Sequence, residues 1–137
     1  MSDNCIFCKI VNNEISSVSL YEDDDFKVIL DISPATKGHA VLIPKKHFPN
    51  LFEMDEETAK KVFVVVAKVA KAMKEELKCD GFNILQNNGE IAGQTVFHFH
   101  IHLIPRYKGD SVQLTWDHVS YKDGEAAELA AKIRERI

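Results

Sequence analysis

Apolar and polar residues alternate over several short segments of the chain, and this period of two is typical of β-strands. Five segments are expected to form strands: residues 19–22, 26–30, 39–43, 81–86 and 98–104. The first two flank the acidic turn Asp23-Asp24-Asp25 and should form a hairpin. The third segment is apolar throughout and stops at Pro44, so we expect it to be buried on both faces.

A period of three to four residues predicts a long helix that follows Asp55 as N-cap and runs to about Lys78. The stripe that should face the core comprises Val62, Val66, Val69, Met73 and Leu77. Phe63, Val64 and Val65 widen this stripe beyond a normal amphipathic face. Either the helix is wrapped on all sides within one chain, or its second face packs against a second copy in a homodimer.

Two shorter helical segments complete the predicted set of elements. Residues 5–11 can form a short helical turn, and residues 125–137 predict a closing helix whose apolar side comprises Ala126, Leu129, Ala130 and Ile133. We find no internal repeat, linker or low-complexity segment, so residues 1–137 are expected to form a single domain. Five strands with a long helix and a terminal helix predict an α+β fold around a mainly antiparallel sheet.

The charge and cysteine content of the chain narrow the classes of partner. With 17 basic and 21 acidic residues, the net charge of −4 argues against non-specific nucleic-acid binding. No apolar run approaches the roughly 18 residues of a membrane span, and no leader precedes Cys5. Three cysteines without a secretory signal indicate reduced thiols or metal ligands. We therefore expect a cytoplasmic protein without a nucleic-acid or membrane partner.

Half of the six histidines stand at alternate positions of the last predicted strand: His98, His100 and His102. There, Phe99, Ile101 and Leu103 would face the core while the imidazoles line the other face. Neighbouring histidines would lie roughly 7 Å apart and the outer two roughly 13 Å, too far for all three to bind one metal ion. Neutral imidazole is a competent nucleophile, so the row predicts a reaction surface.

The loop before this strand, residues 87–95, contains Gly89 and Gly93, which allow close approach of the backbone to a ligand. The loop also offers neutral side chains suited to phosphate oxygens: Asn87, Gln94 and Thr95. Because the loop leads directly into the histidines, we expect it to cradle a phosphate group.

Cys5 and Cys8 form a Cys-x-x-Cys pair that is compatible with a redox pair, half of a metal site or two buried thiols. A thioredoxin-like redox motif should follow a strand, and only four residues precede Cys5. A zinc-finger spacing would require histidines soon after Cys8, whereas the next histidine is His39. Spacing alone leaves the role of the pair open.

The segment His98-Phe-His-Ile-His-Leu-Ile resembles the His-φ-His-φ-His-φ-φ signature of the histidine triad (HIT) family, which comprises nucleotide hydrolases and transferases. His102 stands where the transferase branch has glutamine, so the chain is most similar to the small bacterial-type hydrolases. The resemblance covers roughly residues 4–108, whereas the extension 109–137 matches no family segment. Other similar segments, in family order, are Cys5-Ile-Phe-Cys-Lys-Ile, Asp31-Ile-Ser-Pro, Gly38-His39 to His47 and Gly93-Gln-Thr-Val-Phe.

The resemblance implies a five-stranded antiparallel sheet with two helices, usually in a homodimer. It implies that His100 attacks the α-phosphorus of a nucleotide and forms a nucleotidyl-histidine, which water then hydrolyses. His102 and His39 would contact the phosphate. Asp31 would accept hydrogen bonds from the ribose, although the residue pattern alone favours a strand-end carboxylate that caps a turn. Phosphate and leaving-group contacts would come from Asn87, Gln94 and Thr95.

Family members with the same paired cysteines bind zinc, and the resemblance implies the four ligands Cys5, Cys8, His47 and His98. A set of two cysteines and two histidines with no open position is a structural zinc site. His98 could then hold the metal while His100, about 7 Å further along the strand, remains available to attack. No organic cofactor is expected.

The implied function is hydrolysis at the α-phosphate of AMP-type purine substrates, either nucleoside phosphoramidates or dinucleoside polyphosphates. Two other functions compete with it. The first is a metal-dependent hydrolase in which His100 and His102 bind a catalytic ion. The second is a nucleotide-binding regulatory protein with weak incidental hydrolysis. The metal dependence of activity and the rates across a substrate panel distinguish the three.

Overall fold

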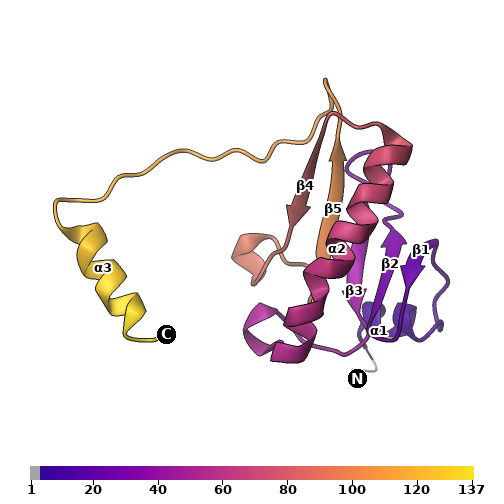
Figure 1. Cartoon of the computed structure of the whole chain (residues 1–137), viewed down its shortest axis with the longest axis horizontal. Helices are drawn as coiled ribbons and strands as arrows, with labels where there is room; N and C mark the ends of the chain where they lie inside the picture. Colours follow the sequence, from indigo (N-terminus) through magenta and orange to yellow (C-terminus); the bar gives the residue numbers. More distant parts are fainter. Residues whose placement is uncertain (1–3) are drawn as a thin grey trace.

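The structure, a computed structural model, describes residues 4–137, and the main body is a five-stranded sheet with one long helix across one face (Figure 1). The strand order is β1-β2-β3-β5-β4, and every pair of neighbours is antiparallel. The predicted α+β fold is therefore confirmed. The strands are β1 (Ser19–Glu22), β2 (Phe26–Leu30), β3 (Ala40–Pro44), β4 (Gly81–Leu85) and β5 (Ile101–Arg106).

The helices lie where the sequence predicts them. Asp55 caps the long helix because its carboxylate accepts a hydrogen bond from the Thr58 backbone N–H at 2.8 Å. The helix ends at Lys78, which adopts a left-handed conformation with φ 51°. Within residues 4–137, no helix is both long and apolar enough to cross a membrane. The helical elements are α1 (Ile6–Val11), α2 (Glu56–Leu77) and α3 (Glu125–Arg134), with 3₁₀ turns η1 (Leu51–Glu53) and η2 (Glu90–Ala92).

The central strand β3 is buried on both faces, as its apolar run predicts. On one face, α2 covers a cluster that includes Phe26, Val28, Leu42, Val66, Phe99, Ile101 and Leu103. On the other face, α1 covers a smaller cluster of Ile10, Val11, Ile29, Val41 and Ile43. The predicted stripe of α2 packs into the first cluster, and Val65 joins it. Phe63 and Val64 are left 61% and 70% exposed, so one chain does not wrap α2 on all sides.

The strand that was expected over residues 98–104 begins only at Ile101, which places His98 and His100 before it. Strand β3 pairs with β5 only as far as Leu42 opposite Ile101. Beyond that point Pro44 has no N–H to donate, and its carbonyl oxygen accepts a hydrogen bond from Nε2 of the His98 side chain at 2.8 Å. The alternation of faces nevertheless continues through this segment, because Phe99 packs in the core and His98 faces away from it.

The C-terminal part of the chain leaves the body after Asp110. Arg106 fixes the backbone at this point. Its guanidinium donates hydrogen bonds to both Asp110 carboxylate oxygens at 2.8 Å and to the Val112 carbonyl at 2.9 Å. An irregular, extended connector then leads to α3, which stands apart from the sheet (Figure 1). The part of the chain that the structure describes therefore leaves the predicted apolar side of α3 uncovered.

Gly38 is required in the turn that leads into β3. Its φ is +91°, a conformation that side chains disfavour, and a Cβ atom there would lie 2.5 Å from Cδ1 of Leu77. The turn thus brings the backbone against the last residue of α2, immediately before His39. Gly109 has a similar φ of +82°, but among the described residues beyond its chain neighbours no heavy atom lies within 4 Å of a Cβ placed on it.

We predict that Gly109→Ala lowers the free energy of unfolding by about 1 kcal/mol, which is the backbone penalty alone. Gly38→Ala should lower it by about 1 kcal/mol more, because Leu77 has to leave its preferred rotamer. Urea denaturation followed by circular dichroism measures both changes. Equal losses in the two variants would show that contact with Leu77 contributes nothing.

Candidate functional site

Four predicted site residues, drawn from three separate parts of the chain, meet beside β3 and β5. His39 immediately precedes β3, and its Nε2 lies 2.9 Å from Nδ1 of His102 in β5. The ring centroids of His100 and His102 are 5.1 Å apart. Asp31 follows β2, and its Oδ2 lies 3.7 Å from His39 Nε2. Antiparallel pairing of β2 with β3 and of β3 with β5 brings these side chains to one place.

The position of the proton on His100 follows from its backbone contact. Its Nδ1 lies 2.7 Å from the carbonyl oxygen of His98, and a carbonyl oxygen can only accept. Nδ1 of His100 therefore carries the hydrogen, and in the neutral imidazole Nε2 keeps its lone pair. This is the tautomer that a histidine nucleophile requires at Nε2.

The tautomers of His39 and His102 follow in the same way. The backbone N–H of Ala35 donates to Nδ1 of His39 at 2.9 Å, so the His39 hydrogen is on Nε2. That N–H then donates to Nδ1 of His102, which leaves the His102 hydrogen on its own Nε2. The neighbouring imidazoles of His100 and His102 thus present opposite groups at Nε2, a lone pair and an N–H.

Burial keeps these imidazoles neutral. Loss of hydration lowers the pKa of His39 and of His100, and the nearby Asp31 carboxylate opposes that shift in both. Burial, followed by repulsion from His100 and His39, lowers the pKa of His102 to about 4. At neutral pH the cluster therefore offers uncharged nitrogen donors and acceptors, which matches the tautomers deduced from the hydrogen bonds.

The residues predicted to contact phosphate have different surroundings. Gln94 is buried, and its amide holds the loop together through Gly89 N–H, the Pro49 carbonyl and the Val96 carbonyl at 2.7–3.0 Å. Its side chain can reach a nucleotide only by exchanging those bonds. Asn87 is half-buried and lies against Gly93, whereas Thr95 is exposed.

The second group of predicted residues, Cys5, Cys8, His47 and His98, also comes together, with all four donor atoms within 4.8 Å of one another. Three of the sulfur to Nδ1 separations are 3.3–3.5 Å: Cys5 to His98, Cys8 to His47 and Cys8 to His98. The two Nδ1 atoms are 3.1 Å apart. A tetrahedral zinc ion with ordinary bond lengths requires roughly 3.6 Å between sulfur and nitrogen and roughly 3.3 Å between nitrogens. The four residues therefore fit a zinc ion.

His98 is also in the tautomer that a metal ligand needs. Its Nε2 donates to the Pro44 carbonyl at 2.8 Å, so Nδ1 carries a lone pair directed at both cysteines. The side chain is fully buried, and burial lowers its pKa to about 4, which keeps the ring neutral. Asp31, His39 and His102 form a second group that is close enough to hold an ion.

Phe7 is a site residue that the sequence analysis did not identify. It stands on α1 between the two cysteines and packs edge-on against His100, with ring centroids 4.9 Å apart, and against His98 at 6.0 Å. Its position between Cys5 and Cys8 was the feature of the sequence that could have indicated a place in the site. The ring links the predicted metal group to the predicted nucleophile.

The chain resembles known proteins over nearly its whole length. It is 45% identical to the protein "hit" of Bacillus subtilis, covering 99% of this chain and 96% of that protein. It is 38% identical to the adenosine 5'-monophosphoramidase of Schizosaccharomyces pombe, covering 98% of each. An adenylylsulfatase of Arabidopsis thaliana is 36% identical over 100% of this chain and 71% of its own length.

Solved structures show the same fold. A crystal structure of a HIT family member from Bacillus subtilis superposes with TM-score 0.94 at 45% identity, covering 98% of each chain. A Streptococcus mutans protein gives TM-score 0.94 at 42% identity, covering 99% of this chain and 87% of that one. A zinc-bound histidine triad protein of Mycobacterium smegmatis gives TM-score 0.75 at 37% identity over 98% of each chain.

The family model of the HIT domain matches residues 12–109, which include His39, His47 and all three histidines of the triad. That range is most of the chain, and the relatives above extend the similarity to both ends. The five-stranded sheet and the meeting of the triad with His39 agree with it. The chain therefore belongs to the HIT family.

Proposed function

We propose that this protein hydrolyses purine nucleoside phosphoramidates or dinucleoside polyphosphates at the α-phosphate, through a nucleotidyl intermediate on His100. The observation that carries the proposal is the opposite protonation of two neighbouring imidazoles. Nε2 of His100 holds a lone pair while Nε2 of His102 holds a hydrogen, as their partners at Nδ1 require. Support also comes from two relatives, at 38% and 36% identity, which are named as an adenosine 5'-monophosphoramidase and an adenylylsulfatase.

The reaction would proceed in two displacements. Nε2 of His100 forms a bond to the α-phosphorus, and the leaving group departs with the electron pair of its own bond and takes a proton from solvent. Water then attacks the same phosphorus and gives up a proton to solvent. The phosphorus–nitrogen bond breaks, which returns its electron pair to Nε2 of His100. Throughout, the Nε2–H of His102 donates a hydrogen bond to a phosphate oxygen and stabilises its charge.

His39 acts through His102 in this scheme. Both of its ring nitrogens are engaged by the protein, so its role is to keep the proton of His102 on Nε2. We propose that Asp31 accepts hydrogen bonds from the ribose. This is supported by its Oδ2, which lies beside the histidine cluster, while its Oδ1 accepts a hydrogen bond from the Ser33 backbone N–H. Thr95 and Asn87 in the preceding loop remain candidates for phosphate and leaving-group contacts.

We expect His100→Ala to lower kcat at least about 10³-fold, because it removes the nucleophile. Mononucleotide affinity, measured by calorimetry, should change little, since binding relies on other groups. Mass spectrometry of the wild-type protein, quenched during turnover, should find the nucleotidyl adduct on His100. Full activity in His100→Ala, or an adduct on another residue, would contradict the mechanism.

A substrate panel separates this enzyme from a regulatory nucleotide-binding protein. The panel should include a purine phosphoramidate, an adenylyl sulfate and a dinucleoside polyphosphate, each measured for kcat/KM. We expect at least one to reach the range of about 10⁴ M⁻¹s⁻¹ or above that enzymes show for their substrates. Slow turnover of all of them together with tight mononucleotide binding would favour the regulatory function.

We further propose that Cys5, Cys8, His47 and His98 hold a structural zinc ion in a reducing, cytoplasmic environment. Support comes from the separations of the four donor atoms and from the tautomer of His98. When bound, the ion would tie α1, at the start of the chain, to the segment that precedes β5. The alternative function, a metal-dependent hydrolase, would instead require an ion among the histidines of the cluster, where Asp31, His39 and His102 are close enough to hold one.

Elemental analysis of purified, dialysed protein should find one zinc per chain. Cys8→Ala should lose most of it, since three remaining ligands bind zinc less tightly. Cys79→Ala is the matched control, because Cys79 is also buried but lies outside the cluster, and it should retain one zinc per chain. A second equivalent of metal that disappears in Asp31→Asn would instead support a metal-dependent hydrolase.

The protein is also proposed to be a homodimer. β4 is an edge strand of the sheet, with Ile84 exposed at 39%, and Phe63 is exposed at 61% on the neighbouring helix α2. Edge strands and exposed apolar patches are typically covered by a partner. A second copy that meets this chain along β4 and α2 would cover both features.

Light scattering should give about twice the chain mass of 15.5 kDa for the wild-type protein. Phe63→Lys should shift the equilibrium toward the monomer, because a charge would be buried in the interface. Val18→Lys is the control, since Val18 is similarly exposed at 59% but lies beside β1, at the opposite edge of the sheet. A monomeric wild-type protein at all concentrations would rule the dimer out.

A further inference from the structure

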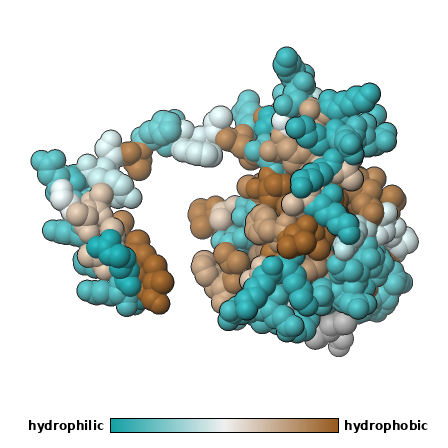
Figure 2. Space-filling model, viewed as in Figure 1, coloured by the Kyte–Doolittle hydropathy of each residue, from teal (hydrophilic) through white to brown (hydrophobic). Residues whose placement is uncertain are grey.

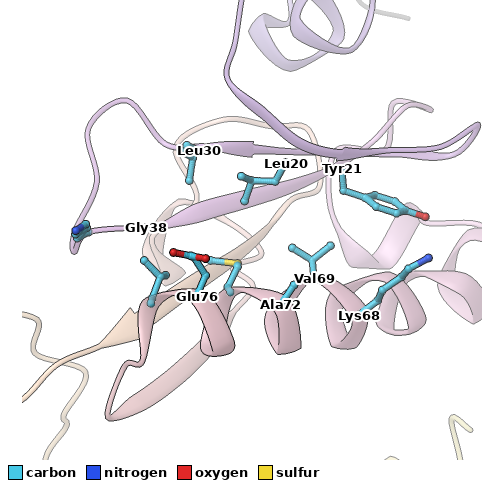
Figure 3. Close-up of a pocket in the computed structure, with 11 residues that line it drawn as sticks. Leu20, Tyr21, Leu30, Gly38, Lys68, Val69, Ala72 and Glu76 are labelled. Carbon is cyan, nitrogen blue, oxygen red and sulfur yellow. The ribbon is translucent and has the colours of Figure 1, made fainter.

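An apolar pocket of about 520 Å³ opens between α2 and the β1–β2 hairpin (Figure 3). Val69, Ala72 and Met73 line it from α2, and Leu20 and Leu30 line it from the strands. It lies on the hairpin side of α2, away from the edge strand β4 and outside the histidine cluster. An open apolar surface of this kind typically receives a ligand or a partner chain.

Helix α3 presents an apolar side that no other segment of residues 4–137 covers. Leu129 and Ile133 are 42% and 51% exposed, and Trp116 in the connector is 76% exposed. In the space-filling view, hydrophobic residues gather on the side of α3 that faces the open space between the arm and the body (Figure 2). We call residues 111–137 the arm. A short helix is marginal in water by itself and gains its stability from packing of such a face.

The position of the arm recurs in other proteins. Residues 111–137 make up about a fifth of the chain. Superpositions that cover 98% and 99% of this chain at TM-score 0.94 have to include the arm, in crystals of proteins from two bacterial genera. An arm without support from its own body would not take the same position in both proteins unless another molecule held it. In crystals of one protein, that molecule is a second copy.

We propose that α3 of one copy packs into the pocket between α2 and the β1–β2 hairpin of a second copy, so that the two chains exchange arms. The connector has about a dozen residues, which can span roughly 40 Å when extended. That reach exceeds the roughly 30 Å width of a small domain. The arm is therefore long enough to cross a neighbouring copy. The exchange is independent of the chemistry proposed for His100.

The charges around the two surfaces are complementary. Lys68 and Glu76 stand on the rim of the pocket, about two turns apart along α2 (Figure 3). Helix α3 carries Glu128 in its first turn and Lys132 and Arg134 in its last. If α3 lies parallel to α2, its acidic end meets Lys68 and its basic end meets Glu76.

Disulfide trapping tests the exchange directly. One preparation carries Ala72→Cys in the pocket, and the other carries Leu129→Cys on the apolar side of α3. The two are mixed, incubated so that subunits exchange, and oxidised mildly at low protein concentration. We expect a covalent dimer that contains one chain of each kind, identified by its intact mass, at a yield at least about tenfold above that of the unmodified chain.

Ala131→Cys provides the matched control for the arm, because Ala131 is exposed on the opposite side of α3. It should cross-link to Ala72→Cys at the background yield. Equal yields for the two arm positions, or none for either, would overturn the proposal. The double variant Ala72→Cys/Leu129→Cys identifies a chain that folds back on itself. If the double variant forms its disulfide within one chain, and the two single variants form no mixed dimer, the proposal is also overturned.

A second measurement avoids added cysteines. Leu129→Asp and Ala131→Asp add the same charge at two positions that are both exposed within one chain. If a second copy covers Leu129, only Leu129→Asp should lower the melting temperature, by several degrees, and the loss should depend on protein concentration. Equal effects contradict the exchange. A small apolar ligand found in the pocket by native mass spectrometry, with the arm unprotected from proteolysis, also contradicts it.

Discussion

The hydrogen bond from His98 Nε2 to the Pro44 carbonyl, 2.8 Å long, determines much of the surrounding structure. It stops the pairing of β3 with the histidine segment, so β5 begins only at Ile101. It also turns Nδ1 of His98 and its lone pair toward the cysteines. The backbone carbonyl of His98 accepts a hydrogen bond from Nδ1–H of His100 and so sets the tautomer of the proposed nucleophile. Through its side chain and its backbone carbonyl, one buried residue thus contacts both the predicted metal group and the predicted nucleophile.

A neutral imidazole carries one ring proton, and this constraint organises the whole cluster. In three of the histidines, a backbone group fixes the protonation of one ring nitrogen. A carbonyl requires a hydrogen on that nitrogen in His98 and His100, and an N–H requires a lone pair in His39. The remaining nitrogens are then determined, and His102 receives its tautomer from His39. Burial lowers the pKa of each ring, so that each imidazole stays neutral and keeps one donor and one acceptor nitrogen. Neighbouring rings can therefore perform different tasks.

In our proposals, the metal group and the arm have similar functions in the fold, because each would attach a terminal segment of the chain. Helix α1 has only six residues, too few to be stable alone, and Cys5 and Cys8 attach it to His47 and His98. Phe7 on the same helix then packs against the ring of His100. At the other end, α3 exposes its apolar face within one chain, so the stability of that helix depends on what covers it.

The sheet, the long helix and the row of three alternate histidines were predictable from the amino-acid sequence, because short-range periodicity and turn residues carry that information. It also placed Phe99, Ile101 and Leu103 in the core. Three features could be learned only from the fold: where β5 begins, which nitrogen of each histidine bears the proton, and that the Gln94 side chain is hydrogen-bonded within its own loop. Those features depend on contacts between residues far apart in sequence, such as His98 with Pro44 and Phe7 with His100. No local pattern in the sequence encodes the partner of a buried polar group.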